Sequence, residues 1–339
     1  MSATIAHEQQ VPEMKRTRVL PPPVTGQELV LIAVIALLWV LLTIFTPAFL
    51  SPNSMQQLLW RLAPVGIMGI GMCMIIITAG IDISIAATLM VCSVTMAKLL
   101  VDADMPFVLA LLVSMLVGVA MGSINGLLIS YGRVAAIIIT FGTANLFQFL
   151  GLLIFNSKTV NGLPNSRDIL GPGVTGQSFG IPHAFMIMVV LMGIAWYYMR
   201  HFPGGRHFYA IGTDERAAAL AGVNVRRRVF LAYSITGLLV GLAAAITIAG
   251  GTTTLDQNVG RGQELVVIAA VVIGGTSIMG GRGSVFGAVL GALLVQTVST
   301  GVTQLGWPSQ LSNLFVGIFI IIAVGVDLLR ERNRRRRNA

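Results

Sequence analysis

Most of this chain consists of uncharged apolar stretches, each long enough to cross a lipid bilayer as a helix. Of its 339 residues, 55% are hydrophobic and 10% are charged, and the mean hydropathy is +0.85. A helix needs about 20 predominantly apolar residues to cross the bilayer core. A water-soluble globule of this length has no interior large enough for so much apolar surface. We therefore expect an all-α polytopic membrane protein with lipid as its solvent.

About ten transmembrane helices are expected when the uncharged windows are used to place them. The uncharged window at residues 283–326 is too long for one helix and contains the break Gly306-Trp307-Pro308, so it is divided into two. The ten predicted spans cover residues 29–48, 62–79, 85–101, 107–130, 134–155, 182–199, 229–250, 265–280, 284–303 and 311–327.

The basic residues between the spans predict the orientation, since cytoplasmic segments of membrane proteins are rich in Lys and Arg. With a cytoplasmic N-terminus, only five of the 22 basic residues fall outside: Arg61, Lys98, Lys158, Arg167 and Arg261. Both termini are then cytoplasmic. The predicted parts are an N-terminal tail (1–28), a transmembrane domain (29–328) with a cytoplasmic loop (200–228) and an outer loop (156–181), and a basic tail (329–339). We expect this basic tail to bind anionic lipid rather than nucleic acid.

The predicted cytoplasmic loop contains the signals of a short helix. Thr213 and Asp214 are expected to cap a helix over residues 215–221, and Gly222 is placed to end it. Asn224 is expected to start a second helix that continues into the next apolar block. A short helix with small side chains on a membrane face is suited to dock into a groove of another protein. The pattern is equally compatible with a helix that lies on its own bundle.

No set of residues typical of an enzyme is visible. The sequence has no phosphate-binding loop of the form GxxxxGK[ST], and its four histidines have no metal-ligand spacing. Cys73 and Cys92 lie within apolar stretches and are interpreted as packing residues. We therefore expect neither a catalytic activity nor a bound metal or cofactor. Transport driven by ATP would need a separate ATPase chain that holds the ATP and Mg²⁺.

A few polar residues inside apolar tracts are candidates for a solute path. Asp82 is the one acid in a long apolar tract, and ionisable residues at membrane depth usually face the bundle interior or a water-filled cavity. The alternatives are that Asp82 caps the following span and that the other polar residues only join helices by hydrogen bonds. The candidates are Asp82, Ser84, Asn125, Thr140, Thr143, Asn145, Gln148 and Glu264.

Two spans carry glycines four residues apart, a spacing that lets helix backbones approach closely in lipid. Gly118, Gly122 and Gly126 lie in the span at 107–130, and Gly287 and Gly291 repeat the spacing in the span at 284–303. We predict close helix packing at both places.

Residues 260–294 read GRGQELVVIAAVVIGGTSIMGGRGSVFGAVLGALL. This block resembles the membrane permease subunits of ATP-binding cassette (ABC) importers for ribose, xylose and galactose, in the branched-chain amino acid/ribose permease superfamily. The match lies in EL-x-x-IAAVVIGGTS followed by GGRGS-x-x-G-x-x-x-G. It is supported by GIDIS at 80–84, TFGT at 140–143 and GTDERAAALAGVNV at 212–225, and the similarity extends from about residue 30 to residue 328.

The resemblance implies a ten-span subunit of a bacterial inner-membrane importer, with two related halves of five spans. Its partners would be a second permease copy or a sister permease, two ATP-binding subunits on the cytoplasmic side, and a periplasmic or lipid-anchored sugar-binding protein. A monosaccharide would be imported by alternating access. A branched-chain amino acid permease and a stand-alone secondary transporter are the alternatives. The residues that the resemblance assigns to coupling with the ATPase are Asp214, Glu215, Ala218, Ala219, Gly222 and Asn224.

Overall fold

The structure is a computed structural model that describes residues 26–163, 176–250 and 253–338, with side chains placed up to residue 325. Most of the predicted N-terminal tail, part of the predicted outer loop and the side chains of the basic tail lie outside the described residues. The helices are α1 (Gly26–Phe45), α2 (Pro52–Ile77), α3 (Ile85–Val101), α4 (Phe107–Gly132), α5 (Ala136–Phe155), α7 (His183–His201), α8 (Pro203–Thr213), α9 (Glu215–Leu220), α10 (Val225–Ala249), α11 (Gln263–Ile273), α12 (Val285–Gln304) and α13 (Gln310–Asn338).

Seven helices in the described part of the chain are long and apolar enough to cross a membrane: α1, α2, α4, α5, α7, α10 and α12. Three shorter apolar helices are α3, α11 and the Gln310–Gly325 part of α13. The chain is therefore a multi-pass helical membrane protein. Each of the ten predicted spans overlaps one of these helices, while the number of crossings stays a prediction.

Two predicted boundaries are wrong for identifiable reasons. The helix α2 begins at Pro52, ten residues before the predicted start, because Ser51 caps it: the Ser51 hydroxyl accepts from the Ser54 amide at 3.4 Å. The span predicted to reach residue 280 ends as a helix at Ile273. It stops there because Gly275 has a φ of +98°, a left-handed conformation that glycine adopts without a steric cost.

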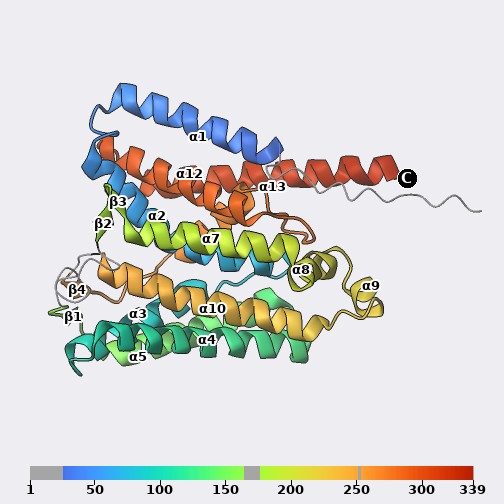
Figure 1. The fold of residues 1–339 in the computed structure, drawn as a ribbon, viewed down its shortest axis with the longest axis horizontal. Coiled ribbons are helices and arrows are strands. Elements are labelled where there is room, and N and C mark those ends of the chain that lie inside the picture. Colours follow the sequence, from blue (N-terminus) through green and yellow to red (C-terminus); the bar gives the residue numbers. More distant parts are fainter. Residues whose placement is uncertain (1–25, 164–175, 251–252, 339) are drawn as a thin grey trace, which may run out of the picture.

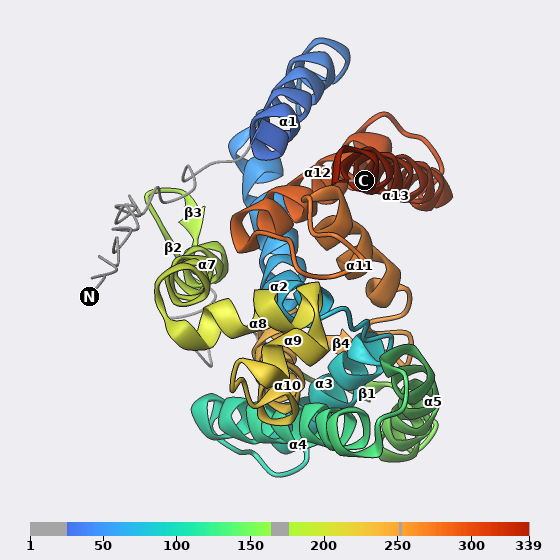
Figure 2. The same ribbon diagram turned by 90° about the vertical axis from the view of Figure 1, so that its right-hand side faces the viewer.

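The helices form a bundle with α2 at its centre (Figures 1 and 2). In the 18-residue apolar stretch of α2, 83% of the residues are buried, and the corresponding share is 67% for α10 and for α12. The corresponding share is only 22% for α1, α5 and α7. A helix that is apolar all round belongs inside a bundle, whereas the apolar outer faces of α1, α5 and α7 suit contact with lipid.

The helices α4 and α10 pack backbone against backbone through glycines. A β-carbon on Gly118 would collide with the Gly237 carbonyl, and a β-carbon on Gly237 would collide with the Gly118 carbonyl. A β-carbon on Gly122 would meet the Tyr233 carbonyl in the same way. The four-residue glycine spacing therefore serves close packing, as predicted.

The second glycine pair joins α12 to α11. A β-carbon on Gly287 would collide with the Gly274 carbonyl, and one on Gly291 would collide with the Ala270 carbonyl. The prediction of close packing is confirmed here as well. These contacts fix α11 against α12 at the place where α11 ends and a glycine-rich loop begins.

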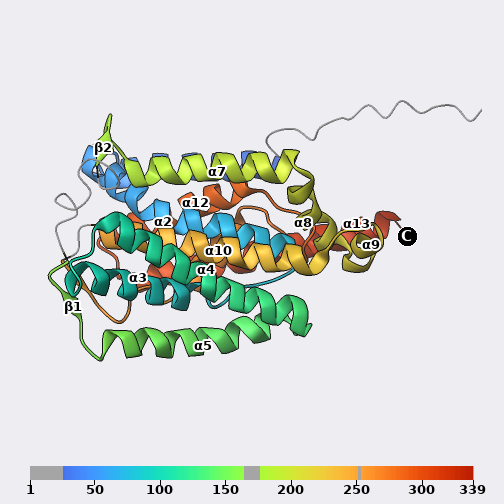
Figure 3. The ribbon, with the colours of Figure 1, turned by 60° about the horizontal axis from the view of Figure 1, so that its bottom comes forward.

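Four short strands lie at one end of the bundle, called here the strand end, and α8 and α9 lie at the opposite end (Figures 1 and 3). The strand β1 (Val160–Asn161) pairs antiparallel with β4 (Thr254–Leu255), and β2 (Gln177–Ser178) pairs antiparallel with β3 (Ile181–Pro182). The first pair ties the beginning of the predicted outer loop to the segment before α11.

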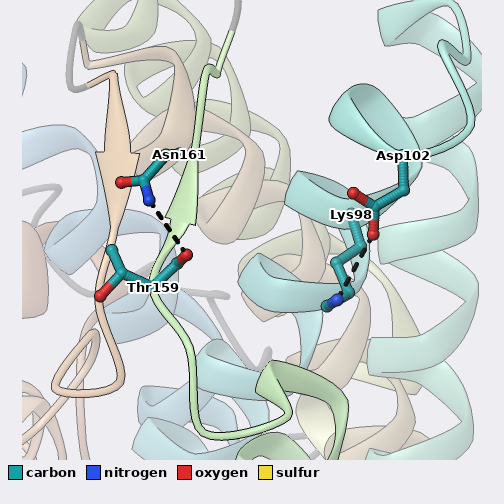
Figure 4. Close-up of polar contacts among 4 residues, drawn as sticks. All are labelled: Lys98, Asp102, Thr159 and Asn161. Carbon is teal, nitrogen blue, oxygen red and sulfur yellow. Dashed lines mark hydrogen bonds and ion pairs between the residues drawn. The ribbon is translucent and has the colours of Figure 1, made fainter.

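Figure 4 shows two polar contacts at the strand end, each between residues close in the sequence. Lys98 and Asp102, near the end of α3, form an ion pair at 3.3 Å, and the Asn161 amide donates to the Thr159 carbonyl at 3.4 Å. Lys98 is partly exposed and Asp102 is exposed, so solvent screens the ion pair and it stabilises the fold little. Val160 and Leu255 are buried in one apolar cluster with residues of α3, α4 and α10, which anchors the β1–β4 pair.

Candidate functional site

The segment between α7 and α10 begins with a helix that the sequence reasoning missed. The helix α8 starts with Pro203, which suits the first helical position, and it buries Phe208 and Ile211 on one face. The proline and this three-residue apolar spacing were the available signals. Thr213 closes α8 and donates its hydroxyl to the Tyr209 carbonyl at 2.8 Å, so its predicted role as a cap of the next helix is wrong.

The second helix of this segment, α9, has the predicted caps. The Asp214 carboxylate accepts from the Ala217 amide at 3.0 Å, and Gly222 follows the helix with a φ of +84°. The Asn224 side chain accepts from the Arg227 amide at 3.0 Å and starts α10. The capping chemistry therefore turns the chain sharply twice and places a short helix between two long ones.

The helix α9 stands out from the bundle (Figure 1). It rests on α8 and on the start of α10, and Ala218 is its one buried residue. Glu215 and Ala219 are exposed, and Leu220 is 91% exposed. Of the two predicted arrangements, this geometry favours a helix that is presented to a partner over one that lies along its own bundle.

Three of the candidate path residues form one buried hydrogen-bonded group. The Asp82 carboxylate accepts from the Ser84 amide at 2.8 Å and from the Ser84 hydroxyl at 2.6 Å. The Asn125 amide of α4 donates to the Ser84 oxygen at 2.7 Å. All three side chains are buried, so Asp82 faces the bundle interior, and Ser84 rather than Asp82 is the residue that precedes α3.

The threonines of α5 have separate partners. The Thr140 hydroxyl donates to the carbonyl of Ile81, in the same turn as Asp82, at 3.0 Å. The Thr143 hydroxyl donates within its own helix, to the Ile139 carbonyl at 3.0 Å. Thr140 therefore fixes α5 to the turn that carries Asp82, while Thr143 has the simple role of a hydroxyl satisfied inside its own helix.

The remaining candidates line a cavity of about 460 Å³ between α3, α5, α11 and the loop that precedes α11. Its polar lining combines Asn145, Gln148 and Glu264, which were predicted, with residues of the loop that were not: Gln257, Asn258 and Arg261. Its apolar lining includes Ile83, Ala86, Ala87 and Met90. Four candidates thus belong to the Asp82 turn and its partners, three line the cavity, and Thr143 belongs to neither group.

The loop residues of the cavity are placed by a contact between distant parts of the chain. The β1–β4 pairing brings the segment after residue 253 beside the segment before residue 163, and the next residues, 257–262, then face α3 and α5. Only the proximity of Asn258 and Arg261 to Glu264 in the sequence pointed to them. Among the described residues, no group of three His, Cys, Asp or Glu side chains is arranged to hold a metal ion.

Residues 54–324 match the protein family described as the permease component of the branched-chain amino acid transport system. The chain belongs to this permease family. The permease is 37% identical to the ribose import permease protein RbsC of Bacillus subtilis (strain 168), over 86% of this chain and 89% of the relative.

Other relatives have similar coverage. The permease is 33% identical to the ribose import permease protein RbsC of Escherichia coli (strain K12), over 88% of this chain and 92% of the relative. It is 34% identical to the fructose import permease protein FrcC of Rhizobium meliloti, over 82% and 79% respectively. No solved structure matches the permease. The family and these relatives agree with the resemblance found in the GGTS and GGRGS block.

Proposed function

We propose that this permease is the membrane subunit of an ABC importer that moves a monosaccharide into the cytoplasm. The observation that carries the proposal is the similarity, over more than four fifths of the chain, to permeases named for ribose and fructose import. A permease named for D-allose transport is 31% identical over 83% of the chain. All three named solutes are polyhydroxylated and uncharged.

The cavity has polar groups that suit a sugar. Four carboxamide side chains line it: Asn145, Gln148, Gln257 and Asn258. A carboxamide both donates and accepts hydrogen bonds, which matches the hydroxyl groups of a sugar. The rest of the lining is mixed: apolar residues come from α3, α5 and the loop, and Arg261 and Glu264 are charged. We assign the cavity to the solute path on this basis.

The proposed topology has ten spans, in two related halves, with both termini in the cytoplasm of a bacterial cell. It places α8 and α9 on the cytoplasmic side and the strand end on the outer side, where a sugar-binding protein would deliver the solute. The count of basic residues supports this orientation, as cytoplasmic loops collect Lys and Arg. Asp82, Ser84, Asn125, Thr140 and Thr143 then lie along the way from the cavity to the cytoplasm.

The proposed partners are a second permease copy or a sister permease and two ATPase subunits, which hold the ATP and Mg²⁺. The segment Asp214–Asn224 is proposed to dock into a groove of the ATPase. Glu215, Ala218, Ala219 and Gly222 would form or shape the docked helix. ATP binding and hydrolysis would shift the permease pair between outward-open and inward-open states.

Uptake by the complete complex in proteoliposomes tests the proposal. The complex of permease, ATPase and sugar-binding protein is expected to take up radiolabelled ribose, fructose or allose only with ATP, and vanadate is expected to stop uptake. Radiolabelled leucine is the control for the branched-chain alternative. Uptake that continues without the ATPase subunit would show that the permease works as a stand-alone transporter, which contradicts the proposal.

A further inference from the structure

The loop between α11 and α12, which contains the GGTS and GGRGS sequence, is in direct backbone contact with two other segments. The Gly281 amide donates to the Ile77 carbonyl, at the end of α2, at 2.9 Å. A β-carbon on Gly212, near the end of α8, would collide with that same carbonyl and with the Gly281 nitrogen. Residues 77–79, 212–213 and 280–283 therefore meet at one place, which we call the glycine junction.

The glycines of the junction leave no room for relative sliding. A β-carbon on Gly280 would lie 2.9 Å from both the Ala79 β-carbon and the Gly212 carbonyl oxygen. One on Gly281 would lie 2.6 Å from the Thr213 hydroxyl oxygen. Distances below 3.0 Å are essentially never tolerated, so the three backbones are packed as closely as glycine allows. Closely packed backbone of this kind transmits displacement instead of absorbing it.

Tyr209 adds a side-chain bond between α8 and the loop. Its hydroxyl donates to the Gly283 carbonyl at 3.2 Å. Partial burial raises the pKa of Tyr209 above its ordinary value, so the hydroxyl keeps its proton as a donor. On the other side of the loop, the Thr276 hydroxyl contacts the Cys73 thiol of α2 at 3.5 Å. The loop is therefore bonded to α8 and to α2 at once.

From the junction the chain leads directly to the candidate path. Ala79, which has a φ of +62°, belongs to the same turn, residues 78–84, as Asp82. That turn is bonded to α4 through Asn125 and to α5 through Thr140, and its Ile83 forms part of the cavity wall. A continuous set of contacts thus connects α8 and α9 with the cavity.

The geometry points to the glycine junction as a rigid joint that carries the movement of α8 and α9 to the turn of Asp82 and to the cavity. Tyr209 is a positioning residue of this joint: it touches neither the solute nor the ATPase but keeps α8 and the loop together. The inference rests on the proposed function, because it describes how the ATP-driven movement reaches the solute path in the same subunit.

Loosening the joint tests the inference, and the chain offers a matched control. Tyr209→Phe removes the bond to Gly283. Tyr198→Phe removes a comparable bond, from Arg228 to the Tyr198 hydroxyl at 3.4 Å, at the same end of the bundle but outside the junction. In the reconstituted complex, Tyr209→Phe is expected to lower the amount of ribose, fructose or allose transported per ATP hydrolysed, because α8 can then move without carrying the loop with it. Tyr198→Phe is expected to keep the wild-type ratio.

The ratio of transport to hydrolysis separates coupling from mere stability. A structural defect lowers the amount of assembled complex, so the rates of transport and of ATP hydrolysis fall together. A loose joint instead leaves the rate of ATP hydrolysis unchanged and lowers the rate of transport. If the wild-type complex transports sugar and the two variants have equal ratios of transport to hydrolysis, this inference is wrong while the proposed function still holds. Absence of ATP-driven uptake by the wild type would overturn the proposed function and this inference with it.

Discussion

The side-chain amide of Asn125 donates to the hydroxyl oxygen of Ser84 at 2.7 Å, between residues 41 positions apart. The Ser84 hydroxyl in turn donates to the carboxylate of Asp82. A carboxylate inside the bundle is thus held by a serine that α4 keeps in position. The Asn125 Oδ1 has no hydrogen-bond partner among the described residues, so the bond to Ser84 is what orients this side chain.

Replacement of Asn125 by Ala is expected to destabilise the permease by about 1–3 kcal/mol, because it removes a buried hydrogen bond at the turn of Asp82. The measurement is thermal unfolding of the purified protein in detergent. Ser123→Ala is the control: Ser123 lies in the same turn of α4, and its hydroxyl contacts Ser234 at 2.8 Å at a less buried place. An equal loss of stability in both variants would show that the bond to Ser84 stabilises the permease no more than the less buried Ser123 contact does.

Replacement of Gly118 by Ala is expected to force α4 and α10 apart at a cost of about 1–3 kcal/mol, the usual range for overpacking. Gly193→Ala in α7 is the matched control, since a β-carbon there meets nothing within 4 Å. It is expected to be neutral or stabilising by up to about 1 kcal/mol, the helix-propensity difference. Thermal unfolding measures both, and an unchanged stability of the Gly118 variant would contradict the packing.

Replacement of Gln148 by Leu is expected to raise the solute KM of transport about five-fold, the effect of about 1 kcal/mol from one lost hydrogen bond. ATP hydrolysis in the absence of solute is expected to stay at the wild-type rate. Phe149→Leu changes the neighbouring residue, which is 63% exposed on the outer face of α5, and serves as the control. An unchanged KM for the Gln148 variant would remove the cavity from the solute path.

Replacement of Leu220 by Ala is expected to reduce the amount of ATPase that co-purifies with the permease, because a side chain that is 91% exposed on α9 is available for docking. Leu146→Ala deletes the same atoms from a leucine that is 62% exposed on α5 and is expected to leave the complex intact. Equal recovery of the ATPase with both variants would speak against docking through α9.

Thiol labelling in intact cells checks the orientation. A cysteine at Arg216 is expected to be protected from a membrane-impermeant maleimide, and a cysteine at Lys158 is expected to react. The native Cys73 and Cys92 are buried, so they give little background. Labelling in inverted vesicles is expected to give the opposite pattern. Reaction at residue 216 in intact cells would show that the permease has the opposite orientation.

The sequence determined where most helices lie and how several of them end. Apolar windows located the spans, because length and polarity are properties of one segment and need no partner. The Asp214 and Asn224 caps and Gly222 were predictable for the same reason: a cap bonds to amides a few residues away. The helix α8 was missed because it is short and lies between charged residues, where hydropathy gives no signal.

The candidate site could be predicted only in part. The polar residues within apolar tracts are either buried or line the cavity, as expected of residues that avoid lipid, and their role in a solute path stays a prediction. Their division between the Asp82 turn and the cavity was not predictable. It depends on the pairing of Val160 with Leu255, on the contact of Asn125 with Ser84 and on the junction of Ile77 with Gly281, all of which join distant parts of the chain.

The sequence by itself therefore showed that lipid surrounds the chain, where most of its helices lie and which family it resembles. Hydropathy and motifs show this because each can be identified within one segment. Only the tertiary structure showed which contacts the glycines of the GGTS and GGRGS loop make. A glycine in sequence permits many conformations, and only its neighbours in space show which one is used. At Gly212 and Gly281, those neighbours are the backbones of two other segments.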